Sequence, residues 1–180
     1  MINWNMVSKI MGALLFIEAA LMSICLGIAV GYGENDVPAF VTSVSLIVMA
    51  GFIFRYFGRR AGNRLSRKDA YLVVTLSWVV FSLFGSLPFM ISGYITNFTD
   101  AFFENMSGFT TTGASVIDNV EALPHGLLFW RTFTQWIGGL GIVFFTVALL
   151  PSLDGGYVKV FSAEITGPIH TKLHPRLSMG

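Results

Sequence analysis

The sequence contains little charge and a single cysteine. Asp, Glu, Lys and Arg make up only 12% of its 180 residues, while 54% are hydrophobic and the mean hydropathy is +0.69. Soluble domains carry about 25% charged residues, so this surplus of apolar side chains excludes an ordinary soluble core and predicts that lipid is the solvent. Cys25 has no second cysteine to pair with, which excludes an intrachain disulfide.

Sequence patterns for enzymatic chemistry are also absent. The sequence has no P-loop, no GxGxxG run and no nucleophile elbow. Its three histidines, His125, His170 and His174, have no Cys or acidic partner at the spacing of a metal site. The net charge is only +1, and the basic residues cluster in one short loop without a nucleic-acid-reading motif. We therefore expect no enzyme activity, no organic cofactor and no nucleic-acid partner.

Long apolar segments dominate the chain. A helix needs about 20 apolar residues to cross a bilayer, and four segments reach that length: 10–31, 37–54, 70–93 and 127–150. A fifth segment, 99–108, is too short to cross and is typical of a re-entrant or interfacial helix. The sequence therefore predicts an all-α, polytopic membrane protein in which Pro88 kinks the third span.

Positive charge is missing from two of the connecting segments. Residues 31–37 and 93–126 contain no Lys or Arg, whereas six basic residues lie between the second and third spans: Arg55, Arg59, Arg60, Arg64, Arg67 and Lys68. The positive-inside rule puts this basic loop, and with it both termini, on the cytoplasmic side. Residues 93–126 are then expected to face the outside.

The short segment 99–108 is expected to be a helix that enters the membrane from the outside. Asn97 or Thr99 can cap its first turn, and Gly108 suits its C-terminus. The partly negative C-terminal end of such a helix points toward the membrane centre, where it favours a cation. Non-helical backbone at that depth is tolerated only where it lines a cavity or is buried in protein.

The uncharged, hydroxyl-rich run after this helix is the candidate ion site. Thr111, Thr112 and Gly113 align with T-V-G of the TVGYG potassium filters, whose carbonyl oxygens replace the hydration shell of the ion. Gly113 can adopt the positive φ that an inward-pointing carbonyl requires. Ala114 and Ser115 stand where the filter has Y-G, so the outer half is expected to be less regular. An extracellular turn without a conduction role is the alternative, because Thr-Gly pairs are common in turns.

Two charged residues lie within the apolar spans. Arg131 is near the start of the fourth span, where we expect it to pair with Glu104 or Asp118 and brace the pore loop, since a free cation there repels a cationic substrate. Glu18 lies in the middle of the first span, where a hydrogen bond to a neighbouring helix is favoured over a place in an ion pathway.

The fourth span also carries small and aromatic residues. We expect Gly138, Gly139 and Gly141 to allow close helix packing, with a gating hinge as the alternative. Trp130 is expected to anchor the helix at the membrane interface, and Trp136 to be a deeper packing residue.

Several stretches of sequence, taken in order, resemble one family. Residues 85–89, 100–113, 130–131, 135–142 and 163–168 are similar to the Trk-type potassium uptake proteins of bacteria (TrkH), within the Trk/Ktr/HKT superfamily. This resemblance implies a potassium-channel-like fold of four membrane–pore–membrane repeats around one pore. In Trk-type proteins, two further transmembrane helices precede the first repeat.

The resemblance assigns a part to each region of the chain. Residues 1–68 correspond to the two leading helices and the basic loop, residues 69–153 to the first repeat, and residues 154–180 to a cytoplasmic segment leading toward a second repeat. Potassium is expected to bind the carbonyls of Thr110, Thr111, Thr112 and Gly113, with Thr111 and Thr112 as ligands. Four residues are expected to support this filter: Glu104, Ala114, Ser115 and Arg131.

The resemblance also implies a location and partners. These are the bacterial inner membrane, the three remaining pore repeats, a homodimer, and a cytosolic RCK-type nucleotide-binding regulator (TrkA). One repeat cannot form a pore alone, so we expect this chain to be part of a longer transporter. Two alternatives stay open: a homotetrameric channel of the two-helix type, and a non-conducting membrane interaction subunit.

Overall fold

The computed structural model describes residues 2–62 and 66–149. The chain divides into two compact units, Met1–Ile142 and Val143–Gly180, and the predicted cytoplasmic segment 154–180 lies outside the described residues. Within the described residues the structure contains helices and turns and no strand, which confirms the all-α class. The helices are α1 (Trp4–Tyr32), α2 (Val37–Gly58), α3 (Arg67–Gly85), α4 (Leu87–Ile91), α5 (Phe98–Phe109), the short 3-10 helix η1 (Val120–Ala122) and α6 (His125–Leu149).

Three described stretches are long and apolar enough to cross a membrane: Trp4–Tyr32, Val37–Gly58 and Lys68–Ile91. They correspond to the first three predicted spans. Residues 127–149 of the fourth predicted span lie within α6, whose 25 residues extend for roughly 37 Å at about 1.5 Å per residue. The predicted break at Pro88 is confirmed, because α3 ends at Gly85 and α4 starts at Leu87 with the proline in its first turn.

Local sequence sets where these helices begin and end. The Asn3 side chain caps α1 by accepting a hydrogen bond from the Met6 N–H, and Gly33 ends the helix in the left-handed conformation with φ 68°. Ser66 and Asp69 form a capping box at the start of α3. These caps lie outside the apolar runs, which is why the observed α1 begins earlier than predicted.

Glycines bring α1 and α2 together. A Cβ atom at Gly12 would lie 2.9 Å from the backbone nitrogen of Arg55 and from the Gly51 carbonyl oxygen. A Cβ atom at Gly58 would overlap the Lys9 backbone. The two helices therefore touch backbone to backbone along one seam, as small residues permit in membranes. Glu18 is buried on α1, and neither of its carboxyl oxygens makes a hydrogen bond to a described residue, so the predicted bond to a neighbouring helix is not found there.

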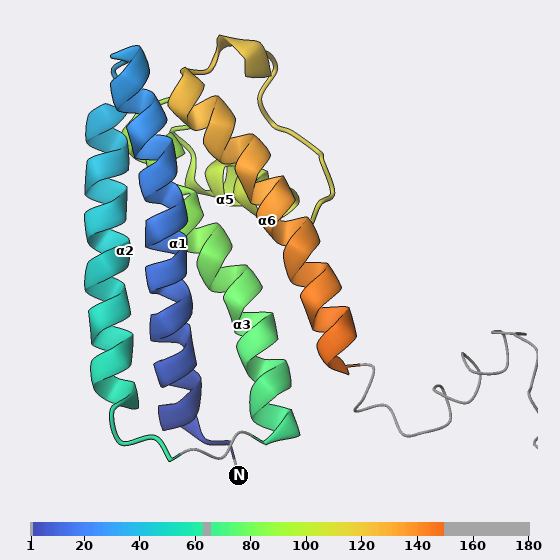
Figure 1. The fold of residues 1–180 in the computed structure, drawn as a ribbon. Helices are drawn as coiled ribbons and strands as arrows, with labels where there is room; N and C mark the ends of the chain where they lie inside the picture. Colours follow the sequence, from blue (N-terminus) through green and yellow to red (C-terminus); the bar gives the residue numbers. More distant parts are fainter. Residues whose placement is uncertain (1, 63–65, 150–180) are drawn as a thin grey trace, which may run out of the picture. The chain divides into compact units, whose positions relative to one another are not determined.

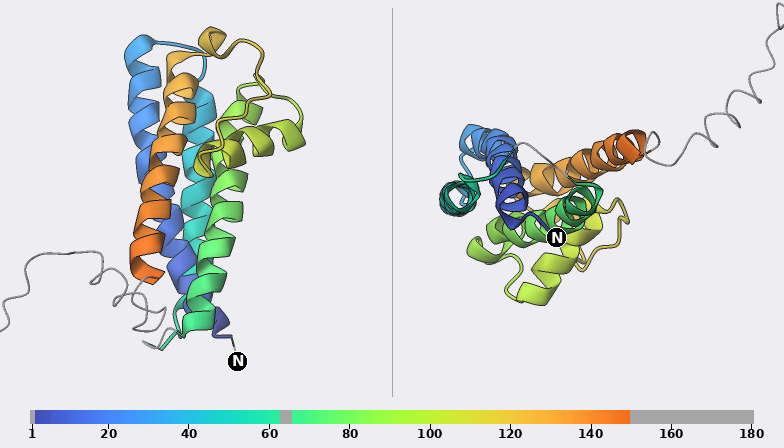
Figure 2. Two further views of the ribbon diagram at one scale, coloured as in Figure 1. Left: turned by 90° about the vertical axis from the view of Figure 1, so that its right-hand side faces the viewer. Right: turned by 90° about the horizontal axis from the view of Figure 1, so that it is seen from below.

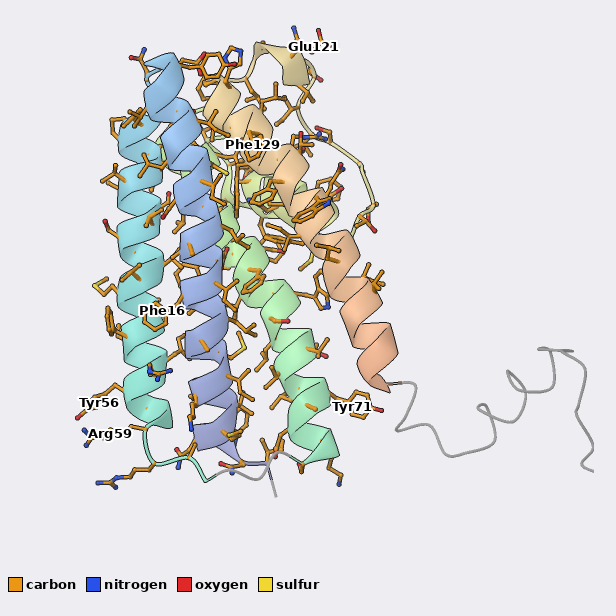
Figure 3. All side chains as sticks on the ribbon, viewed as in Figure 1. Phe16, Tyr56, Arg59, Tyr71, Glu121 and Phe129 are labelled. Atoms are coloured by element: carbon orange, nitrogen blue, oxygen red, sulfur yellow. The ribbon has the colours of Figure 1, made fainter. Side chains whose placement is uncertain are left out.

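In the first unit, α1, α2 and α3 run alongside one another (Figure 1). The short helix α5 lies across the direction of α3 (Figure 2). Figure 3 shows Arg59 and Tyr56 at one end of the bundle and Glu121 at the opposite end, which we call the Arg59 end and the Glu121 end. The basic segment after α2 and the acidic segment before α6 therefore lie at opposite ends of the bundle.

Candidate pore loop

The candidate site begins at the N-terminus of α5. The Asn97 side chain accepts a hydrogen bond from the Thr99 N–H at 3.0 Å, so Asn97 is the cap and Asp100 lies in the first turn. The acidic side chain complements the positive end of the helix dipole. The face of α5 that carries Ala101, Glu104 and Asn105 is buried in the bundle. The predicted short helix is therefore confirmed, from Phe98 to Phe109.

The C-terminus of α5 is closed by a Schellman arrangement. The Thr111 N–H donates to the Gly108 carbonyl at 2.9 Å, and the Thr112 N–H donates to the Ser107 carbonyl at 2.9 Å. This closure needs a left-handed residue after the helix, and Thr111 occupies that position with φ 56°. A β-branched residue is strained there, at a typical cost of about 1–3 kcal/mol. The helix thus turns sharply into the candidate filter.

The expected role of Gly108 as the terminating glycine is wrong. Gly108 is buried inside α5, and a Cβ atom there would overlap the Thr134 hydroxyl of α6. Glycine is needed at position 108 because α6 packs against α5 there. The left-handed residue that ends α5 is Thr111.

Four consecutive carbonyl groups follow this turn without hydrogen bonds. Within the described residues, no donor bonds the carbonyl oxygens of Thr110, Thr111, Thr112 or Gly113. All four residues are exposed, and Gly113 has φ 77°, in the region that favours glycine. Unpaired carbonyls are costly in a membrane unless another group satisfies them, so this run is suited to binding a cation.

The chain beyond Gly113 is fastened to α5. The Ala114 carbonyl accepts a hydrogen bond from the Ser107 hydroxyl at 2.6 Å. The Ser115 hydroxyl donates to the Glu104 carboxylate at 3.0 Å, and the Val116 N–H donates to it at 2.9 Å. These bonds fix the return path of the loop while leaving the preceding four carbonyls free.

The Glu104 carboxylate also receives Arg131 from α6. The Arg131 Nε lies 2.5 Å from Glu104 Oε1, and the Glu104 side chain is only 1% exposed. The sequence predicted that Arg131 pairs with Glu104 or Asp118, and in the structure its partner is Glu104. Because a buried charge is tolerated when it is paired and hydrogen-bonded, Glu104 can serve as a junction between α5, the return segment and α6.

Close packing joins α6 to the end of α5. A Cβ atom at Gly138 would overlap the carbonyl group of Phe109, the last residue of α5. Four residues earlier on the same face of α6, Thr134 meets Gly108. This finding supports close packing as the role of Gly138. Sequence reasoning named the glycine but missed its partner, although Thr134 and Gly138 follow the small-xxx-small spacing of membrane helix contacts.

The first of the two tryptophans of α6 is not where the sequence predicted it. Trp130 is fully buried, and its Nε1–H donates to the Gly85 carbonyl at 2.9 Å, where α3 breaks. Trp136 is 60% exposed in this chain. The interfacial role predicted for Trp130 is therefore wrong, because a carbonyl left free by the helix break offers its indole N–H a buried partner.

The start of α6 is held by the turn between α1 and α2. The Glu34 carboxylate accepts hydrogen bonds from the His125 N–H at 2.6 Å and pairs with the His125 ring at 2.8 Å, while Tyr32 stacks on that ring at 3.9 Å. The hydrogen bond from the His125 side chain lowers the pKa of Glu34. Asp36 is packed against Gly126, and burial raises its pKa. Sequence reasoning missed this contact, which joins residues far apart in the chain.

The described helices, three of which are long and apolar enough to cross a membrane, identify a polytopic, all-α membrane protein. Residues 37–179 match the TrkH family, described as cation transport protein. The chain therefore belongs to the TrkH family.

Relatives of known name match almost the whole chain. It is 38% identical over 176 residues to the Trk system potassium uptake protein TrkH of Halomonas elongata, covering 97% of this chain and 36% of the relative. It is 33% identical over 176 residues to the Trk system potassium uptake protein TrkG of Escherichia coli, covering 97% of this chain and 36% of the relative.

A solved structure matches as well. The crystal structure of the potassium transporter TrkH from Vibrio parahaemolyticus aligns with a TM-score of 0.78 at 34% identity, over 91% of this chain and 36% of that one. The chain thus spans about a third of the length of the proteins it matches.

Proposed function

We propose that this chain supplies one of four pore loops of a protein that takes up potassium across the bacterial inner membrane. The observation that carries the proposal is the run of four exposed residues, Thr110, Thr111, Thr112 and Gly113, whose carbonyl oxygens accept no hydrogen bond from a described residue. The names of the relatives, which are potassium uptake proteins, support the choice of ion.

In this proposal potassium is the substrate, and it sheds water as carbonyl oxygens take over its coordination. Thr111 and Thr112 contribute oxygens from this chain, and three counterparts of the loop complete the ring. The C-terminal end of α5 adds a partial negative charge behind them. No covalent step is needed, because the concentration gradient and the membrane potential, about 2.3 kcal/mol per charge per 100 mV, drive the ion.

The supporting residues act by holding the loop in shape. Glu104 accepts hydrogen bonds from Ser115 and the Val116 N–H, and Arg131 pairs with its carboxylate. The Ser107 hydroxyl donates to the Ala114 carbonyl, which separates that carbonyl from the four that accept no hydrogen bond from a described residue. A filter that does not need to rearrange on ion arrival binds with less loss of entropy.

The proposed orientation puts the Arg59 end and both termini in the cytoplasm, following the positive-inside rule. The Glu121 end then faces outward, where its acidic residues raise the local concentration of cations. A homodimer and an RCK-type nucleotide-binding regulator (TrkA) on the cytoplasmic face complete the proposed assembly.

The test is rubidium uptake into proteoliposomes that contain the intact protein. Gly113→Ala forces a Cβ atom onto a residue with φ 77°, and Gly93→Ala, at φ 80° and with open space around it, is the matched control outside the loop. We expect Gly113→Ala to reduce uptake by at least about tenfold, the effect of losing one favourable carbonyl contact of about 1.4 kcal/mol, while Gly93→Ala retains uptake.

Gly113→Asp provides a second, independent reading. It adds a negative charge beside the carbonyls and is expected to change the ratio of sodium to rubidium uptake as well as the rate. If Gly113→Asp, Gly113→Ala and the unsubstituted protein all transport alike, the pore-loop function is refuted.

A further inference from the structure

The outward face of α2 carries an apolar groove near the Arg59 end. The groove has a volume of about 640 Å³ and is lined by Phe52, Ile53, Arg55, Tyr56 and Phe57. Its apolar lining residues are each about half or more exposed in this chain. Figure 3 shows Tyr56 and Arg59 together at this end of α2. The groove is distant in sequence from the pore loop and takes no part in the proposed filter.

The walls of the groove are held by ring contacts. Phe52 packs edge-on against Phe16 of α1 with ring centres 5.0 Å apart, and Tyr56 packs edge-on against Phe57 at 6.1 Å. The guanidinium carbon of Arg59 lies 4.4 Å from the centre of the Tyr56 ring, which fixes a cation above an apolar surface. Such contacts preform the groove before any ligand enters.

Two arginines lie at the groove, Arg55 in its lining and Arg59 above the Tyr56 ring. Arg55 and Arg59 are four residues apart and so lie on the same face of the helix end. A third basic residue, Lys9 of α1, has its backbone packed against Gly58, the residue before Arg59. The described acid at this end, Asp69, is only 2% exposed and accepts hydrogen bonds from the Asn3 N–H and from Ser66. It therefore offers little compensating charge at the surface.

We propose that this groove binds an anionic diacylphospholipid, with an acyl chain against the aromatic rings and the phosphate between Arg55 and Arg59. The groove belongs to a helix long and apolar enough to cross a membrane, which favours a lipid over an aqueous ligand. A second copy of the chain is a poorer occupant, because it brings the same basic residues face to face. Basic clusters next to a membrane helix attract anionic headgroups, and the apolar groove supplies the hydrocarbon contact.

Native mass spectrometry of the purified protein tests the proposal. The protein is mixed with phosphatidylglycerol or with phosphatidylcholine of the same acyl chains, and the number of retained lipids is counted. We expect the wild type to retain phosphatidylglycerol preferentially. The double variant Arg55→Gln/Arg59→Gln is expected to bind it roughly 30-fold more weakly, the loss expected when two basic side chains no longer attract an anionic lipid.

Two further variants separate a site from general charge. Arg60→Gln removes the same kind of exposed charge one residue beyond Arg59 and is expected to keep most of the binding, and Arg55→Lys/Arg59→Lys is expected to restore it. Equal retention of both lipids by the wild type overturns the proposal without reference to any variant. Equal losses in Arg60→Gln and in the double variant, or self-association that Phe57→Ser abolishes in the absence of lipid, also overturn it.

Discussion

Gly138 of α6 faces the carbonyl group of Phe109 so closely that a single added carbon atom at Gly138 would overlap it. The next residue, Gly139, is different, because a Cβ atom there would lie 3.8 Å from the nearest atom, the Thr111 methyl carbon, at ordinary van der Waals distance. Adjacent glycines therefore have unequal roles, and one of them sets how near α6 comes to the start of the candidate filter.

This contrast predicts unequal effects of two alanine substitutions. Gly138→Ala forces α6 and the end of α5 apart and is expected to destabilise the fold by about 1–3 kcal/mol, the range for overpacking, and to abolish rubidium uptake. Gly139→Ala is expected to leave rubidium uptake within a factor of about two. It is also expected not to destabilise the fold, since alanine is a better helix former than glycine. Thermal unfolding and uptake on the same preparations check this, and similar behaviour of the two variants contradicts it.

The junction at Glu104 predicts a coupled pair. Arg131→Met leaves a buried carboxylate without its cation and is expected to cost about 3–5 kcal/mol of stability. Adding Glu104→Gln in the same chain removes the unpaired charge, so the double variant is expected to be more stable than Arg131→Met alone. A double-mutant cycle on the free energy of unfolding measures the coupling, and simple additivity within about 0.5 kcal/mol argues against a functional pair.

Much of the fold was predictable from the lengths of the apolar runs. The first three spans, the break at Pro88 and the Asn97 cap depend on local composition and on groups within a few residues of one another. Such features are fixed by the chain itself, so sequence reasoning found them.

The contacts that hold the site together depend on residues far apart in the chain. Trp130 was expected at the interface, yet it bonds the Gly85 carbonyl, which is free only because α3 breaks there. Gly108 was expected to end α5, but Thr134, a helix away, requires it to lack a side chain. Neither partner is visible in a window of neighbouring residues. The ion-binding role of Thr110–Gly113 stays a prediction.

Thr111 predicts a stabilising substitution. Because its φ of 56° is strained for a β-branched residue, Thr111→Gly is expected to stabilise the fold by about 1 kcal/mol. Thr112→Gly lacks this benefit and breaks the 2.9 Å contact between the Thr110 and Thr112 hydroxyls, so it is expected to lower the melting temperature. Thermal unfolding of the two variants in detergent decides the matter, and a lower melting temperature for Thr111→Gly excludes strain at this residue.

Glu34 and Asp36 predict opposite dependences on pH. The folded pKa of Glu34 lies below its ordinary value of 4.5, so its contact with His125 stabilises the fold above that pH and is lost as the pH falls through the lowered value. The folded pKa of Asp36 lies above its ordinary value of 3.8, so stability falls as the pH rises from 3.8 through the raised value.

Two variants separate these effects in melting temperature measured from pH 3 to pH 7. We expect Glu34→Gln to lower the melting temperature at neutral pH and to flatten the decline below about pH 4.5, and Asp36→Asn to raise the melting temperature at neutral pH. Glu121→Gln, an exposed acid on η1, is the control and is expected to follow the unsubstituted protein. Parallel curves for all the variants exclude both assignments.

The hydrogen bonds between Glu34 and His125 connect the α1–α2 hairpin to α6. The turn between α1 and α2 is bonded to the first turn of α6, so exchanging this hairpin between related proteins also changes the contact that holds α6. A chimaera that imports a foreign hairpin needs a side-chain acceptor at position 34, or the backbone N–H of residue 125 at the start of α6 loses its partner. The α1–α2 hairpin thus stabilises the start of α6.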